Sequence, residues 1–146
     1  MSKLKSTISA TLIVDDNGAD REWSRVVLGQ TKRFKNILEA TTGSEALDLF
    51  LNYEASRARH PDAFPPLLIV LDINMPAMDG FEFLERFASQ REELRRRGAE
   101  PCVIMMISSS NDPRDRKRAK DLVEDFITKP LTQEQAHRIA DMFGTS

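Results

Sequence analysis

Three carboxylates stand at the ends of apolar segments in this 146-residue chain. Asp15 and Asp16 follow the apolar run 10–14, and Asp72 follows the most apolar run of the sequence, 67–71. Carboxylates that lie close together repel one another unless a cation joins them, and oxygen ligands of this kind suit Mg²⁺. The three aspartates therefore predict a magnesium site, provided that the fold brings them together.

A hydroxyl and an ammonium group occupy equivalent places later in the chain. Ser108 follows the apolar run 102–107, and Lys129 follows the run 125–128. A fixed positive charge and a hydroxyl donor can stabilise a phosphoryl group in transit while a carboxylate attacks it. Asp72 is the natural nucleophile of the set, and its product would be an acyl phosphate.

Short apolar runs and helical patterns alternate along the chain. The runs lack polar alternation, as parallel strands covered on both faces do. They are residues 10–14, 36–40, 67–71, 102–107 and 125–128. Five strands that alternate with five helices predict an α/β fold with a parallel sheet and helices on both faces. Ligands of such sheets bind beyond the carboxyl ends of the strands, so the polar residues above are expected to meet there.

The helices are predicted from their apolar faces. The first, near 19–30, should bury Trp23, Val26 and Val27, and the third should begin after Gly80 and end near Gly98. The second, third and fifth helices should bury further apolar stripes. These are Ala46, Leu47, Phe50 and Leu51; Phe81, Leu84, Phe87 and Ala88; and Ala136, Ile139, Ala140 and Phe143. Residues 52–66 should lengthen the second helix and then form a surface loop with three prolines.

Capping signals mark three of these helix starts. Thr42 with Glu45, and Thr132 with Gln135, have the spacing of capping boxes. Asp112 and Pro113 read as an N-cap followed by proline at the first helical position.

Composition and charge exclude several protein classes. Charged residues make up 30% of the chain, hydrophobic residues 40%, and the net charge is −2, which gives no general attraction to nucleic acid or to an anionic membrane. One cysteine, Cys102, excludes an internal disulfide and a Cys-rich zinc site, and should pack as a small apolar residue. His60 and His137 show no partner pattern and are expected at the solvated surface. With no long apolar run and no signal peptide, we expect a soluble cytoplasmic protein.

Four motifs give the sequence a specific resemblance. They are IVDDN (13–17), LDINMPAMDG (71–80), MMISSS (105–110) and FITKP (126–130). In this order the motifs are similar to those of the receiver domains of two-component response regulators, over residues 8–143. The resemblance implies one receiver domain over 1–146, with a flavodoxin-like (βα)5 doubly wound parallel sheet in the strand order 2-1-3-4-5.

The resemblance also implies roles for the acidic residues. Asp15 and Asp16 would hold Mg²⁺, and Asp72 would be the phosphoacceptor and a third ligand. The backbone carbonyl of Asn74 would complete the protein ligands, and Lys129 would contact the phosphoryl group.

The switch residues are assigned in the same way, with two departures from the family pattern. The segment before the fifth strand lacks the usual glycine and is one residue shorter, so counting back from Lys129 gives Ile107, which has no hydroxyl. Ser108 is therefore assigned as the switch hydroxyl, with Ser109 as the alternative. The aromatic switch position is Phe126 rather than tyrosine, and the Lys129–Pro130 peptide bond is expected to be cis.

A stand-alone response regulator is the function that the resemblance implies. A sensor histidine kinase, with a phytochrome-type kinase as a weaker suggestion, would phosphorylate Asp72. The chain ends just after the last predicted helix, so we expect no output domain. The phosphorylated protein would switch the surface formed by the fourth helix, fifth strand and fifth helix. It would then act on a downstream protein target or a phosphotransfer protein.

Other functions stay open at this stage. The chain could be a phosphorelay intermediate or a phosphate-independent adaptor of receiver fold. An aspartyl-phosphate phosphatase is disfavoured, because Asn74 stands where such enzymes need an acid and the chain has no room for a cap domain. We therefore expect a regulatory protein rather than an enzyme.

A basic segment opens the fourth predicted helix. Arg114, Arg116, Lys117, Arg118 and Lys120 could form a surface for an acidic protein partner, and a merely solvated face is an equal alternative. A homodimer through the fourth and fifth helices is a further expectation.

Overall fold

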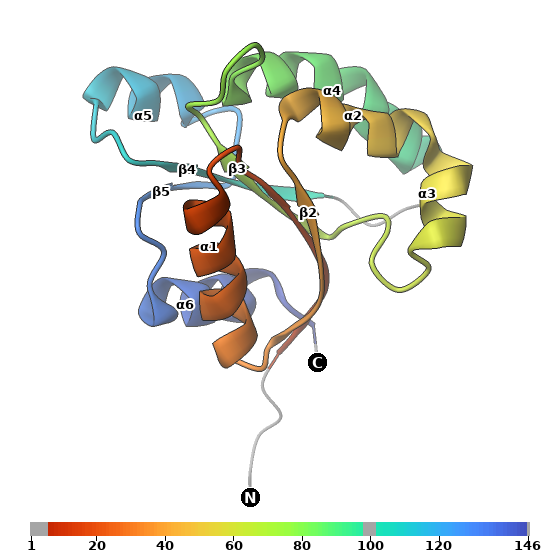
Figure 1. Ribbon diagram of the computed structural model, residues 1–146, viewed down its shortest axis with the longest axis horizontal. Helices are drawn as coiled ribbons and strands as arrows, with labels where there is room; N and C mark the ends of the chain where they lie inside the picture. The colour runs from red at the N-terminus through yellow and green to blue at the C-terminus, as the bar shows by residue number, and fades with distance from the viewer. Residues whose placement is uncertain (1–5, 98–101, 146) are drawn as a thin grey trace, which may run out of the picture.

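The computed structural model describes residues 6–97 and 102–145, in which five strands alternate with six helices (Figure 1). The strands are β1 (Ile8–Val14), β2 (Phe34–Ala40), β3 (Leu68–Asp72), β4 (Val103–Ser108) and β5 (Asp125–Thr128). The helices are α1 (Gly18–Gln30), α2 (Gly43–Leu51), α3 (Tyr53–Arg59), α4 (Gly80–Arg96), α5 (Pro113–Ala119) and α6 (Gln133–Phe143).

The strands form one parallel sheet in the order β2-β1-β3-β4-β5. This arrangement confirms the flavodoxin-like fold and the strand order that the resemblance implied. β1 and β3 are neighbours in the sheet, and each is followed by a loop at its carboxyl end. The reversal of strand order beside β1 therefore lies at the ends of the strands that carry Asp15 and Asp72.

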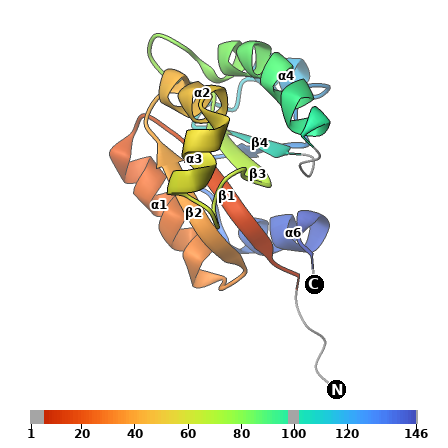
Figure 2. The ribbon, with the colours of Figure 1, turned by 90° about the vertical axis from the view of Figure 1, so that its right-hand side faces the viewer.

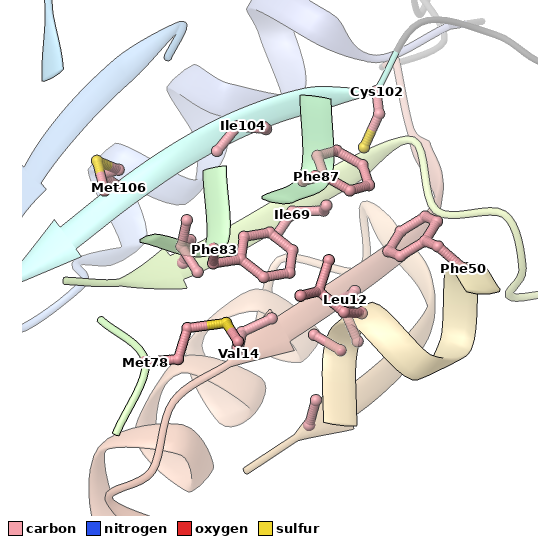
Figure 3. Packing of buried hydrophobic residues seen from close by; sticks show 14 of the residues in the cluster. Leu12, Val14, Phe50, Ile69, Met78, Phe83, Phe87, Cys102, Ile104 and Met106 are labelled. Carbon is pink, nitrogen blue, oxygen red and sulfur yellow. The ribbon is translucent and has the colours of Figure 1, made fainter. Parts of the chain in front are cut away.

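Helices cover both faces of the sheet (Figures 1 and 2). On one face α2, α3, α4 and α5 pack over alternate strand residues such as Leu12 and Ile69, with Phe50, Phe83 and Phe87 between sheet and helices (Figure 3). On the other face α1 and α6 cover the remaining strand residues. Two separate apolar layers thus hold the five strands rigidly, which fixes the positions of the residues at their carboxyl ends.

The buried face of α1 agrees with the prediction at Val27 and differs from it at Trp23 and Val26. Trp23 and Val26 are 52% and 40% exposed, whereas Ser24, Val27 and Leu28 are buried. The spacing of the buried residues, 24, 27 and 28, is that of one helix face, and this face rather than the largest side chains meets the sheet. The indole nitrogen of Trp23 donates a hydrogen bond to the carbonyl oxygen of Leu131 (2.8 Å), so the ring lies against the loop between β5 and α6.

Residues 53–59 form a separate helix, α3, rather than an extension of α2. Asn52 interrupts the two helices with a non-helical backbone (φ −106°, ψ 50°). The change of direction lets Tyr53 bury its ring against Phe64, with the ring centroids 5.4 Å apart. Leu51, predicted to be buried, is exposed, whereas Ala46, Leu47 and Phe50 of the same predicted stripe are buried.

The capping predictions are mostly confirmed. Thr132 and Gln135 form a complete capping box, and Asp112 caps α5 with Pro113 in the first turn. Thr42 caps α2, but the Glu45 side chain accepts from Thr41 instead of returning to the cap backbone.

Three further predictions concern single elements. α4 ends at Arg96, and its predicted terminator Gly98 lies outside the described residues. The fully buried Phe83 was missing from its predicted face. Both histidines are half-buried rather than fully solvated, and Nδ1 of His137 lies 3.3 Å from Arg33 Nη1.

Among the helices of residues 6–97 and 102–145, none has the length and apolarity needed to cross a bilayer.

Candidate functional site

The predicted carboxylates meet at the carboxyl ends of β1 and β3. Asp15 and Asp72 are buried and Asp16 is exposed, and one oxygen from each lies within 4.8 Å of the others. The backbone N–H of Asn17 donates to Asp15 Oδ1 (2.9 Å), and that of Asn74 donates to Asp72 Oδ1 (3.2 Å). Each buried carboxylate is thus oriented by the backbone two residues further along.

Lys129 reaches the same cluster from the end of β5. Its Nζ lies 3.0 Å from Asp15 Oδ2, 3.5 Å from Asp72 Oδ2 and 2.9 Å from Asp20 Oδ2. The peptide bond that follows, Lys129–Pro130, is cis. One ammonium group therefore serves three carboxylates and cannot neutralise all of them.

Asp20 was not predicted from the sequence, although a signal for it exists. Asn17 caps α1 through its side chain, which accepts from the Asp20 backbone N–H (3.0 Å). The first turn of a helix that begins at the carboxyl end of β1 must lie beside the candidate site, and an acid is favoured in that turn. An acidic residue in this turn could therefore have been included among the candidates.

Burial and charge repulsion perturb the central groups. Burial, followed by the neighbouring charge of Asp15, raises the pKa of Asp72 to about 7, although Lys129 and the Asn74 N–H act in the opposite direction. Burial lowers the pKa of Lys129, but hydrogen bonds to Asp20 and Asp15 outweigh it, so that the pKa is raised overall. The cluster carries more negative charge than the protein itself compensates.

The donor set fits a hard divalent cation. Three carboxylates whose oxygens lie within 4.8 Å of one another offer the oxygen ligands that Mg²⁺ prefers. Asp15, Asp16 and Asp72 are thus the residues that could hold Mg²⁺, as the sequence predicted.

The turn after Asp72 depends on a glycine. A Cβ atom on Gly80 would lie 2.8 Å from the carbonyl oxygen of Asp72 and 3.0 Å from Cα of Ile73. The Gly80 N–H also donates to the Ile73 carbonyl (2.9 Å). Because only glycine permits this close approach, α4 can begin directly against the backbone that carries Asp72.

Ser108 and Ser109 have different environments. Ser108 ends β4 and is 0% exposed, whereas Ser109 is exposed. The Oγ atom of Ser108 accepts hydrogen bonds from Asn74 Nδ2 (3.1 Å) and from the Ser110 N–H (3.0 Å). Of the two candidate switch hydroxyls, Ser108 is therefore the one in contact with the residues around Asp72.

The basic residues of α5 are partly engaged within the protein. Arg116 places its guanidinium 4.8 Å from the ring centroid of the half-buried Phe126 and donates to Thr128 (3.0 Å). Arg118 lies over the ring of Phe81, and Arg114 pairs with Asp112. Two members of the predicted patch, Lys117 and Lys120, are exposed and make no ion pair within the part of the chain that the structure describes. They line a pocket of about 430 Å³ together with Phe126.

Comparisons with known proteins agree with this geometry. The sequence pattern of the response regulator receiver domain matches residues 11–141. Chemotaxis protein CheY of Halobacterium salinarum is 29% identical over 120 residues, which cover 82% of this chain and 83% of that protein. The chain spans only 28% to 34% of the length of the protein-glutamate methylesterases that it also matches.

Solved structures extend the likeness to the whole fold. A two-component response regulator from Cytophaga hutchinsonii is 28% identical with a TM-score of 0.75, and the match covers 94% of this chain and 97% of that one. A bacteriophytochrome response regulator is 25% identical with a TM-score of 0.71, and the match covers 95% and 96% of the two chains.

Proposed function

Because the chain belongs to the response regulator receiver domain family, we propose that Asp72 accepts a phosphoryl group and that this event switches a protein-interaction surface. The observation that carries the proposal is the cluster of Asp15, Asp16, Asp72 and Lys129, in which carboxylates exceed cations at the carboxyl ends of β1 and β3. Such a site favours the binding of a divalent cation, and the bound cation in turn favours the binding of an anionic phosphoryl group.

The reaction follows from the placement of each residue. A carboxylate oxygen of Asp72 forms a bond to phosphorus while the bond between phosphorus and the donor's nitrogen or oxygen breaks, and the leaving group takes up a proton. Lys129 lies 3.5 Å from that carboxylate, so its ammonium group is placed to balance the charge of the phosphoryl oxygens. Mg²⁺ held by Asp15, Asp16, Asp72 and the Asn74 backbone carbonyl would neutralise the remaining charge.

Switching would begin at Ser108 and end at the surface of α5, β5 and α6. Ser108 would donate to the new phosphoryl group, and Phe126 on β5 would change its packing beneath Arg116. The exposed Lys117 and Lys120, beside Phe126, would then offer positive charge to an acidic partner. Such a switch is a population shift between two conformers, which a short helix such as α5 permits.

A sensor histidine kinase is the proposed phosphoryl donor. The likeness to a bacteriophytochrome response regulator makes a phytochrome-type kinase the first candidate to test. Within this proposal the chain is regulatory, and the phosphorylated surface acts on a protein target or a phosphotransfer protein.

Incubation with acetyl phosphate and Mg²⁺, followed by intact-mass measurement, tests the proposal directly. We expect one phosphoryl adduct on the wild type and none on Asp72→Asn. Asp121→Asn, an exposed acid away from the cluster, is the matched control and should be phosphorylated normally. Absence of the adduct from the wild type would favour a phosphate-independent adaptor, and turnover of a small phosphoester would favour a phosphatase.

A further inference from the structure

The hydrogen bonds of Ser108 are unusual for a buried hydroxyl. A serine oxygen has two lone pairs and one proton. Both lone pairs of Ser108 are used, one by Asn74 Nδ2 at 3.1 Å and the other by the Ser110 N–H at 3.0 Å. Ser108 can therefore accept no further hydrogen bond and can act only as a donor.

The proton of this hydroxyl has no acceptor among the protein groups of residues 6–97 and 102–145. Ser108 is completely buried at the end of β4, and a buried donor without an acceptor is unfavourable. The site thus contains a donor prepared for an oxygen that arrives later. Under the proposed function that oxygen belongs to the phosphoryl group on Asp72.

Asn74 connects the donor to the acceptor residue. Its backbone N–H bonds to Asp72 Oδ1 (3.2 Å), and its side-chain amide bonds to Ser108 Oγ (3.1 Å). One residue of the turn after β3 therefore orients both the carboxylate that would be phosphorylated and the hydroxyl that would contact the product.

We propose that Asn74 is a positioning residue whose side-chain amide fixes Ser108 as the hydrogen-bond donor to a phosphoryl group on Asp72. This role rests on the proposed function and is additional to the metal ligation expected of the Asn74 backbone carbonyl. Without the amide, one lone pair of Ser108 is released and the hydroxyl can turn its proton in other directions. The loss of one such hydrogen bond changes an equilibrium about two- to tenfold.

A double-mutant cycle on Asn74 and Ser108 tests the proposal. The affinity for beryllofluoride, which mimics a phosphoryl group on a carboxylate, would be measured with saturating Mg²⁺. We expect Asn74→Ala to weaken binding about two- to tenfold when Ser108 is present and to have no effect in a Ser108→Ala background. An equal loss in both backgrounds would overturn the proposal, because Asn74 would then act independently of the hydroxyl.

The control variant is Asn36→Ala. Asn36 also makes one side-chain hydrogen bond to the protein, to the Ser9 carbonyl (2.9 Å), but on β2 and away from the site. This variant should bind beryllofluoride as the wild type does. Since Asn74 is exposed, Asn74→Ala should lose at most about the free energy of one hydrogen bond and stay fully folded at the assay temperature, so a folding defect would not account for the loss.

A second measurement separates this proposal from the proposed function. Without Mg²⁺ or a phosphoryl donor, Asn74→Ala should shift the NMR signal of the Ser110 amide, because the acceptor that the two groups share is altered. An unchanged signal would overturn the Asn74–Ser108 contact itself. Failure of the wild type to form any adduct would overturn the proposed function, whereas normal adducts with an additive cycle would overturn the positioning role alone.

Discussion

The guanidinium of Arg33 and the carboxylates of Asp15 and Asp72 are all buried, but they lie at opposite ends of the sheet. The charge of Arg33 is balanced by its partners, whereas the charges of the two carboxylates are not. At the amino ends of the strands, Arg33 donates to the Ser6 carbonyl, the Ser6 hydroxyl and the His137 carbonyl, and it pairs with Asp141. At the carboxyl ends, Asp15 and Asp72 share one ammonium group, which is also bonded to Asp20.

The difference separates a charge that the protein compensates from charges that it leaves uncompensated. The Arg33 contacts join the segment before β1, the start of β2 and the end of α6, so they hold three parts of the chain together. The carboxylates of Asp15 and Asp72 lie at the ends of neighbouring strands and share one ammonium group. Burial, followed by the charge of Asp15, raises the pKa of Asp72 there. A protein retains such an arrangement where an external cation or anion completes it.

Removal of Arg33 should have the largest effect on stability. Arg33→Met removes the donor of the Ser6 carbonyl and the second donor of the His137 carbonyl, which keeps the N–H of its own helix. We expect a loss of about 2–4 kcal/mol in the free energy of unfolding. Urea unfolding followed by circular dichroism measures it. Asp141→Asn is the control and should cost about 0–1 kcal/mol, because that carboxylate is 68% exposed. Equal losses in the two variants would contradict a role for the backbone contacts.

Asp72→Asn should instead stabilise the protein when Mg²⁺ is absent, and the gain should depend on pH. With a folded-state pKa of about 7 and an ordinary value of 3.8, the folded protein binds more protons than the unfolded chain between these two values. Stability contributed by this group is therefore full below about pH 4 and is lost as the pH rises to about 7. The variant should be more stable than the wild type by about 1–3 kcal/mol at pH 8 and equally stable near pH 4.

Urea unfolding at several pH values with a chelator gives this difference. Asp121→Asn, whose carboxylate is exposed, should show no such dependence on pH. Added Mg²⁺ should stabilise the wild type and leave Asp72→Asn unchanged. A stability difference that stays constant from pH 4 to pH 8 would contradict the raised pKa and with it the contrast between the two ends of the sheet.

The two ends of the sheet also differ in how far the sequence predicts them. Asp15, Asp72 and Lys129 each follow a short apolar strand, so their meeting follows from the parallel sheet alone. The Arg33 cluster was not predicted, because Ser6, Arg33, His137 and Asp141 belong to no common motif and meet only when α6 packs against β1 and β2.

The orientation of side chains is a second feature that the sequence pattern alone does not predict. The strand order followed from the resemblance, but the face of α1 was assigned to the apolar residues Trp23, Val26 and Val27, of which only Val27 is buried. The buried face is set instead by which side of the helix meets the sheet, and that depends on the crossover from β1 to β2. The Asn74–Ser108 hydrogen bond could not be predicted from the sequence either, because it depends on the conformation of the Asn74 side chain in the loop after β3.

Asp20→Asn should have the smallest effect on the free energy of unfolding. The variant tests how the charge of Lys129 is divided among Asp15, Asp20 and Asp72. Asp20 is half-exposed, and Lys129 also contacts Asp15 at 3.0 Å, a contact that should remain when the charge of Asp20 is removed. The free energy of unfolding should change by less than about 1 kcal/mol. The pKa of Lys129 should fall, because one of the two hydrogen bonds that raise it loses its charged acceptor.

NMR titration of the Lys129 ammonium group measures this pKa, and urea unfolding measures the stability. A loss of stability as large as that of Arg33→Met would mean that Asp20 fixes the fold, whereas a fall in the pKa with stability unchanged would mean that this end of the sheet adjusts charge without holding the chain.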